Sequence, residues 1–513
     1  MKNVKNRPLV DRFIERYLPI RGAKRAKARL STKIINSYTG ADTGRRTLSG
    51  YTTAHNDANS DILDSLDMLR QRSRDLEQNN PIAKGILNTK LTNVIGSGLK
   101  YHSRINREVL NLSEDQADAW EGKAEQEWGL FWNGKNVDIT RTSTGTALLR
   151  MAYHQMKMNG DSITLLPRVS VVNHPYRTRL QLIEADRLSN PHRTSDTETL
   201  AGGVETDKYG APIRYHISDR HPGSLYGEDT WRPYNAFGRT TGLRNVIHLY
   251  DKRRPGQSRG VPDLHAIIEP LRLLDKYTEA ELMAAVVSGM FTVFVETPSG
   301  EVDFDISSIS EETGQKSSDK DHKMAPGSIV GLAKGEKVHD SNPGRPNAAF
   351  DPFFQSIVKQ IGVGVEIPFE VLMKHFSSSY SASRAAMLDA WRYFITERAF
   401  VVDNYMRPIQ EAWMYEAVSS GRLIAPGYFT DPLIRMAYLG SEFRGPAKGH
   451  LDDEKEASAA KIRMESKLTT LAEETAELTG GDWEKNHKQQ VKERNKQLKD
   501  GLIVEETTDG NAK

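Results

Sequence analysis

The feature that most constrains this chain is one stretch in which two β-type runs flank a long amphipathic helix. The stretch reads VIHLYDKRRPGQSRGVPDLHAIIEPLRLLDKYTEAELMAAVVSGMFTVFV and spans residues 246–295. The first run, Val246–Tyr250, leads into a turn rich in Arg, Pro and Gly, and the second run is Phe291–Val295. Because the stretch holds no acid–base pair, metal cluster or phosphate loop, it indicates a structural strut and not a catalytic site.

Apolar residues recur at helical spacing from Pro262 to Met290, which predicts one continuous helix. At 1.5 Å per residue such a helix is roughly 40 Å long, and Pro270 is expected to bend it. A helix of this length needs partners for its apolar face. Repeated head-to-tail contacts between copies close into a ring when the rotation allows.

Length and composition favour a multidomain protein of the reducing cytoplasm. The 513 residues allow about two to four domains. The chain has no cysteine, which excludes disulfides, thiolate metal sites and cysteine nucleophiles. Its longest largely apolar run, Met283–Val295, is too short to span a bilayer, so we expect no membrane partner.

The net charge of +2 conceals a strongly basic N-terminus. Residues 1–33 contain eleven Lys and Arg against Asp11 and Glu15. Such an arm is typical of segments that meet nucleic acid or another anionic surface. A solvated tail that keeps the chain soluble explains the same composition equally well.

The periodicity predicts an α+β fold that is predominantly helical. We expect helices over 61–77 with Ser60 as cap, 82–95 with Asn80 as cap, 114–132, 144–158, 350–361 and 382–418, the last kinked at Pro408. Strands are expected over 162–166, 179–183, 213–217 and 246–250, with a hairpin turn at 207–210.

No motif for catalysis is complete in the sequence. Residues 129–136 nearly fit a phosphate loop, but Asn136 replaces the required Ser or Thr, and the segment follows a Trp-rich helix, so a helix end is the better interpretation. The histidines lack ligand spacing, and no metal site or cofactor is expected. Glu184 and Asp186 would serve a nuclease only by chance. Trp120, Trp128 and Trp132 have the spacing of core residues more than of base-stacking ones.

Several blocks, taken in order, resemble one known family. They are RSRDL (72–76), NNP (79–81), NVIGSG (93–98), LQLIEADRL (180–188), RPGQSRGVP (254–262), PGSI (326–329), Leu332 with Gly335-Glu336, YSASRAA (380–386), Asp453 with 455–457, and Gly481-Asp482. Together they cover roughly residues 60–500 and are similar to the lambda-type portal proteins of tailed bacteriophages.

The resemblance implies a portal-type fold with a wing, a two-helix stem, a clip and a helical crown, assembled as a ring. It would divide the chain into 1–59 (basic, loosely ordered arm), 60–261 (wing), 262–290 (first stem helix), 291–349 (clip), 350–363 (second stem helix), 364–381 (tunnel-loop region), 382–425 (long wing or crown-side helix) and 426–513 (crown and charged tail).

The implied function is a channel at one capsid vertex, without catalysis. A separate terminase would package double-stranded DNA through a ring of about twelve subunits, and the DNA would leave toward the tail. The implied partners are further copies of the chain, DNA held non-specifically, the terminase large subunit, major capsid and scaffold proteins, and a head–tail adaptor. The location would be the virion, and the host cytoplasm during assembly.

Residue roles follow from the same assignment. The candidates for the tunnel loop and channel wall are Lys374, His375, Phe376, Ser377, Ser378, Ser379, Tyr380, Lys276 and Lys359. For Lys276, Lys359, Lys374 and His375, a position in the subunit interface is an equally good interpretation. The candidates for contacts with a neighbouring subunit are Arg253, Arg254, Arg259 and Arg384. The alternative function is a nucleic-acid-processing enzyme, either a packaging nuclease or a helicase-like factor.

Overall fold

The computed structural model describes most of the chain. The described residues are 46–225, 229–289, 293–296, 329–332, 349–376, 379–449 and 452–503, with a few isolated positions before residue 46. The chain forms two compact units, Met1–Asp57 and Ala58–Lys513. In the first unit a short 3₁₀ turn is described at Arg46–Leu48. The predicted arm (1–59) and clip (291–349) lie largely outside the described residues.

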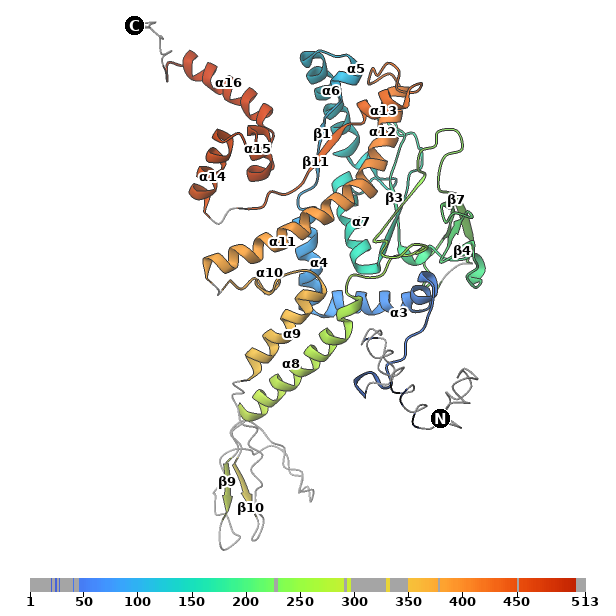
Figure 1. Ribbon diagram of the computed structural model, residues 1–513, viewed down its shortest axis with the longest axis vertical. Helices are drawn as coiled ribbons and strands as arrows, with labels where there is room; N and C mark the ends of the chain where they lie inside the picture. The colour runs from blue at the N-terminus through green and yellow to red at the C-terminus, as the bar shows by residue number, and fades with distance from the viewer. Residues whose placement is uncertain are drawn as a thin grey trace, which may run out of the picture. The chain divides into compact units, whose positions relative to one another are not determined.

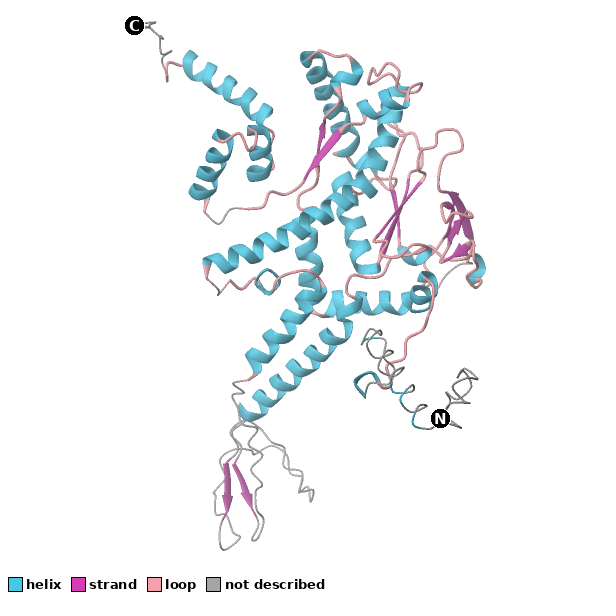
Figure 2. Ribbon diagram, viewed as in Figure 1, coloured by secondary structure: helices cyan, strands magenta, loops and turns pink. Residues whose placement is uncertain are grey.

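Helices dominate the second unit and begin with α3 (Ala58–Asn79) and α4 (Pro81–Val94) (Figure 2). Asn80 caps α4 as predicted, since its side chain accepts from the amide of Ala83. The expectation that Ser60 caps the first helix is wrong. The helix starts earlier because Asn59 exchanges two hydrogen bonds with Ser258, 2.9 and 3.1 Å long, which fix its first turn.

Three further helices complete the N-terminal part, namely α5 (Arg107–Leu110), α6 (Glu114–Trp132) and α7 (Gly145–Asn159). Ser113 opens α6 with a full capping box, in which the Gln116 side chain accepts from the Ser113 amide in return. Helix α6 ends at Trp132 with Asn133 as its C-cap, so the phosphate-loop lookalike is a helix end.

Two small sheets lie beside these helices. One has the order β3 (Gln181–Ile183), β2 (Asp161–Leu165), β8 (Val246–Tyr250), all antiparallel. The other runs β4 (Leu200–Ala201), β5 (Val204–Thr206), β6 (Pro212–Ser218), β7 (Trp231–Asn235). The predicted hairpin at 207–210 joins β5 to β6. Another pair, β1 (Lys100–Ser103) with β11 (Ser441–Arg444), was not predicted.

Helices α8 (Ile268–Gly289) and α9 (Phe350–Gly364) lie side by side and antiparallel (Figure 1). The two helices contact each other through aromatic side chains, since Tyr277 of α8 stacks on Phe350 of α9 with ring centroids 5.6 Å apart. The α-helix begins later than predicted, after a 3₁₀ turn at His265–Ile267. Pro270 therefore lies in the first turn of α8, where a missing N–H costs nothing, and the predicted bend at Pro270 is wrong.

The base of this helix pair is buried against α3 and α4. Leu271 and Leu274 of α8 and Val358 and Ile361 of α9 share one apolar cluster with Ile86 of α4. Beyond the pair, the strands β9 (Val293–Glu296) and β10 (Ile329–Leu332) are parallel partners. The strand predicted at 291–295 is thus present as β9.

A long helical segment follows in three parts, α10 (Phe369–Met373), α11 (Tyr380–Val401) and α12 (Arg407–Ser419). A π-turn at Val402–Met406 joins α11 to α12, and the Arg407 amide bonds to the Val402 carbonyl. Pro408 is the next residue, so the irregularity predicted at this proline takes the form of a π-turn just ahead of it.

Helix α12 lies in the largest core, where Trp413 meets the rings of Trp128 and Tyr101 at centroid distances of 5.1 and 6.0 Å. After α13 (Pro432–Tyr438) and β11 come α14 (Asp453–Glu465), α15 (Leu471–Thr479) and α16 (Trp483–Lys499). Within the described residues no helix is both long and apolar enough to cross a membrane.

Candidate functional site at the root of the helix pair

The turn between β8 and α8 lies between two buried groups of charges. We call the first the Asp263 cluster, which consists of Asp263, Lys90, Lys157 and Glu397. We call the second the Asp161 cluster, which consists of Asp161, Arg70, Arg259 and His248. Arg259 and Asp263 both belong to the turn, so this short segment contributes one charge to each cluster.

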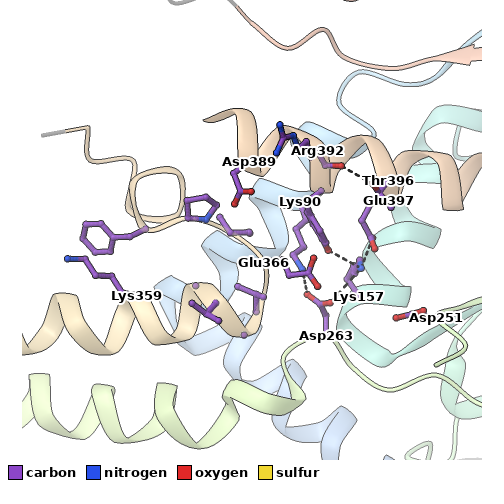
Figure 3. Close-up of a pocket in the computed structure, with 18 of the residues that line it drawn as sticks. Lys90, Lys157, Asp251, Asp263, Lys359, Glu366, Asp389, Arg392, Thr396 and Glu397 are labelled. Atoms are coloured by element: carbon purple, nitrogen blue, oxygen red, sulfur yellow. Dashed lines mark hydrogen bonds and ion pairs between the residues drawn. The ribbon is translucent and has the colours of Figure 1, made fainter. Parts of the chain in front are cut away.

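The Asp263 cluster joins α4, α7, α11 and the start of the helix pair (Figure 3). The carboxylate of Asp263 lies 2.6 Å from the Lys90 ammonium and 3.6 Å from that of Lys157. Lys157 also lies 2.6 Å from Glu397, and the Lys90 ammonium lies 4.7 Å from the centre of the Tyr393 ring. One acidic side chain thus holds α4 and α7 against the turn that leads into α8.

Both charges at the centre of this cluster are stabilised in their ionised forms. Burial opposes ionisation of Asp263, but the ammonium groups of Lys157 and Lys90 outweigh it and lower the pKa to about 2. Burial also opposes the charge of Lys157, yet Asp263 and Glu397 raise its pKa. Removing one partner would leave a buried charge without compensation, which typically costs about 3–5 kcal/mol.

The Asp161 cluster joins α3, the central strand β2 and the same turn. Asp161 is fully buried, and its carboxylate lies 2.9 Å from Arg70, 2.5 Å from Arg259 and 3.3 Å from His248. Arg70 also donates to the backbone carbonyl of Asn159 at 2.9 Å. Burial opposes the ionisation of Asp161, but Arg259 and Arg70 hold its pKa well below the usual range.

The expectation that Arg259 faces a neighbouring subunit is wrong. Arg259 is 2% exposed and binds Asp161 of its own chain. The rest of the guanidinium donates to three backbone carbonyls, those of Ala185, Leu188 and Gly202, over 2.5–2.8 Å. Arg259 therefore fixes the turn to the segments that follow β3 and β4. No sequence pattern indicated these acceptors, because they are backbone atoms.

A close approach of two backbones holds the turn in place. Gly260 packs so tightly on Gly160 that an added Cβ would lie 1.9 Å from the Gly160 carbonyl oxygen. Gly160 has φ +92°, a conformation that disfavours side chains, and its own Cβ would meet the Gly260 backbone at 2.6 Å. Only glycine at both positions lets the turn reach the α7–β2 connection.

A polar pocket of about 920 Å³ opens beside the Asp263 cluster, between α9, α10 and α11. Figure 3 shows Glu366, Asp389, Arg392 and Lys359 around it. Basic and acidic side chains line it in nearly equal number, so the pocket favours neither an anion nor a cation. Its geometry fits a junction between elements better than a substrate site.

The predicted tunnel loop connects α10 to α11. Lys374 ends α10 in the left-handed conformation (φ 54°), and Ser379 caps α11 by accepting from the Ala382 amide at 3.4 Å. His375, Phe376 and Tyr380 are exposed, and Lys455 of α14 lies 5.7 Å from the Tyr380 ring. Ser377 and Ser378 lie outside the described residues. The described part of the segment is thus an exposed connection, and its place in a channel stays a prediction.

The two lysines predicted for the channel wall lie on different helices. Lys276 of α8 is exposed, and Lys359 of α9 is exposed with its ammonium 5.3 Å from the centre of the Phe369 ring. The remaining interface candidates are paired within the chain: Arg253 with Asp251 at 2.8 Å, Arg254 with Asp61 at 2.5 Å, and Arg384 with Glu456 at 2.9 Å. These three pairs are partly exposed, so contact with a neighbouring subunit stays a prediction for them.

One group with metal-ligand chemistry comes together that sequence spacing did not predict. Carboxylate oxygens of Glu184 and Asp186 and a ring nitrogen of His221 lie within 4.8 Å of one another. Asp186 is also hydrogen-bonded to the guanidinium of Arg74, which supplies the positive charge that a metal would otherwise provide. The group is therefore explained as an ion cluster that joins α3 to the segment after β3.

The tryptophans belong to the core, as their spacing predicted. Trp128 and Trp132 are 4% and 2% exposed and stack with centroids 5.2 Å apart. Trp120 is partly buried and donates its indole N–H to the Ile424 carbonyl at 2.9 Å. The Trp120 ring also packs on that of Tyr438, with centroids 5.0 Å apart, so all three rings have partners within the chain.

Comparison with known proteins finds one family model and several relatives to which the chain is similar. Residues 44–398 match the family model described as phage portal protein, lambda family. The chain is 25% identical over 451 residues to portal protein B of Escherichia phage lambda, with 84% of each chain covered. It is 24% identical over 475 residues to the portal protein of Escherichia phage N15, with 89% of each covered. It is also similar to a chain in the neck of an empty gene transfer agent particle (TM-score 0.43, 10% identity, 79% of this chain and 92% of that chain).

Proposed function

Because the chain belongs to the lambda family of phage portal proteins, we propose that it forms a ring of about twelve subunits around a DNA channel. The ring occupies one vertex of the capsid and connects the head to the tail. The observation that carries the proposal is the family match over residues 44–398, which includes the helix pair α8/α9 and its buried root.

Uncovered apolar side chains on the helix pair support assembly. Leu273, Leu282, Met283 and Val286 of α8 are 47–65% exposed, and Phe353 of α9 is 50% exposed. Apolar surface of this kind is typical of interaction sites. Adjacent copies of the pair, placed side by side around an axis, cover these residues with one another and close the ring.

The channel carries double-stranded DNA without sequence specificity. We assign the connection at 374–380, with Lys276 and Lys359, to the surface that DNA passes. A passage must hold DNA weakly, since each phosphate that a cation neutralises adds salt-dependent affinity and resists movement. A chain of net charge +2 satisfies this condition better than a strongly basic one.

The chain acts as a conduit and not as an enzyme, so the motor is a separate protein. The partners that fit this role are the terminase large subunit during packaging, the major capsid and scaffold proteins during assembly, and a head–tail adaptor afterwards. The protein then belongs to the virion, after assembly in the host cytoplasm. The buried charge clusters hold the stem rigidly to the wing while DNA moves past.

Two measurements test the proposal. Negative-stain microscopy of the purified chain is expected to show rings with a central opening, and monomers under all salt conditions would overturn the proposal.

Replacing residues 374–378 by a Gly-Ser segment of equal length keeps the Ser379 cap. This variant is expected to form rings but to package or retain less DNA, whereas a Gly-Ser replacement of the exposed Lys208-Tyr209 tip is expected to have no effect. If the loop variant no longer assembles, the loop assignment is wrong.

A further inference from the structure

Helix α16 (Trp483–Lys499) is a basic helix without a core-facing side. It carries six Lys and Arg against two Glu, and none of its residues is buried. From Lys485 to Gln497 every residue is exposed. Since α16 buries none of its residues, its charges face solvent, and their arrangement is informative.

Four lysines form one stripe along this helix. At 3.6 residues per turn, Lys488, Lys492, Lys496 and Lys499 fall within an arc of about 80° and extend over about 16 Å. In the described part of the chain none of these four ammonium groups has an ion pair. The neighbouring Lys485 differs, since it pairs with Glu125 at 2.7 Å.

The start of α16 is fixed to the folded unit. Asp482 caps the helix through the amides of Glu484 and Lys485, and its carboxylate lies 3.1 Å from the buried His102. Arg444 donates to the Gly481 carbonyl at 2.9 Å. The stripe is therefore presented from an anchored end next to the β1–β11 pair.

The composition of the stripe fits a polyanion better than a protein surface. Protein interfaces are depleted of lysine at their centres and enriched in aromatic residues, Met and Arg. The lysine ammonium keeps its water and acts as a point charge, which suits contacts with phosphates. A length of about 16 Å corresponds to the rise of about five nucleotides of one DNA strand.

We propose that the lysine stripe of α16 binds the phosphate backbone of double-stranded DNA, independently of sequence. This inference rests on the proposed function and deepens it. The conduit carries DNA, and the stripe is a surface of the chain that binds that DNA. This surface is distinct from the connection at 374–380, where passage requires weak contact. Each lysine on a phosphate releases a counterion, so the binding is strongly salt-dependent.

The test measures the affinity of the full chain for a fluorescently labelled 30-base-pair duplex of random sequence across a salt series. Three proteins are compared: the natural chain, K488Q/K492Q/K496Q/K499Q, and a control with the same charge change at exposed positions outside α16, K123Q/K135Q/K208Q/K252Q. Glutamine has nearly the helix propensity of lysine, so α16 stays folded, as circular dichroism will confirm. The basic arm is present in all three proteins.

In the α16 variant the negative slope of log K against log salt is expected to become shallower by about 3.6, since each phosphate that the variant no longer neutralises accounts for about 0.9. Its binding is expected to weaken on the order of a thousandfold at 0.1 M salt. The control is expected to keep the natural slope. Equal slopes in all three proteins would overturn the proposal. Binding to poly-glutamate, a polyanion without phosphates, is measured in parallel, and an α16 variant that binds poly-glutamate less tightly but DNA as tightly as the natural chain would also overturn the proposal. Microscopy of the same samples tests the ring separately, so failure of the proposed function is distinguishable.

Discussion

Replacing Asp263 by alanine is expected to destabilise the full chain by about 3–5 kcal/mol, because the substitution leaves the ammonium groups of Lys90 and Lys157 buried beside an apolar methyl group. Lys157 keeps Glu397 at 2.6 Å, whereas Lys90 loses its one close carboxylate in the described part of the chain. Most of the destabilisation therefore arises at Lys90. Adding Lys90→Met removes the unpaired charge, and the double variant is expected to be more stable than D263A alone.

The pH dependence of the free energy of unfolding gives a second measure of the contribution of Asp263. The pKa of Asp263 lies at about 2 in the folded chain against an ordinary value of 3.8. A lowered pKa means that the contribution is fully present above about pH 4 and is lost as the pH falls from 4 to 2. At about 1.36 kcal/mol per unit, the difference corresponds to about 2.5 kcal/mol. The stability gap between the natural chain and D263A is expected to narrow over that range.

Urea unfolding at pH 7 and at low pH measures both effects. Asp251→Ala is the matched control, since Asp251 is exposed and its pair with Arg253 contributes at most about 1 kcal/mol. If D263A falls within about 1 kcal/mol of D251A, the Asp263 cluster does not hold the helix pair. A gap that stays constant from pH 7 to pH 2 would contradict the assigned pKa.

Three other substitutions test the root of the helix pair and the core. Arg259→Met is expected to lower the free energy of unfolding by about 3–5 kcal/mol in the same assay, and Arg253→Met by less than about 1 kcal/mol. Equal losses would contradict the buried, paired position of Arg259. Gly260→Ala is expected to destabilise by about 1–3 kcal/mol or more through its clash with Gly160, while Gly122→Ala, with open space around it in α6, is expected to stabilise by about 0.5–1 kcal/mol. Trp128→Ala is expected to cost about 3–5 kcal/mol by leaving a cavity, with near-neutral stability contradicting its core position.

Local features of the fold followed from the sequence because short-range chemistry determines them. Strand β8 has the predicted bounds, and the predicted cap at Asn80 lies where its hydrogen bond to a nearby amide requires. The predictions at Ser60 and Pro270 failed for a different reason. At Ser60 a contact with Ser258 moved the helix start earlier, and at Pro270 a 3₁₀ turn within the predicted helix moved the start of the α-helix later. Propensity does not contain that information.

The candidate site was only partly predictable. The turn after Tyr250 stood out by its composition, but the partners of Arg259 come from segments far away in the sequence, and several are backbone carbonyls. The pairing of Lys100 with Arg444 in the β1–β11 ladder has the same origin. Contacts over such separations depend on how the elements pack, so a pattern within one segment does not specify them.

The function proposed for this chain depends on copies that form a ring whose opening is lined by the connection at 374–380. A cryo-electron microscopy reconstruction of the purified full chain would show both the ring and the lining at once. We expect a closed ring of about twelve subunits, with the α8/α9 pairs side by side around the axis and Lys374–Tyr380 at the lumen. A ring with these residues on its outer rim, or particles without an opening, would contradict the proposal.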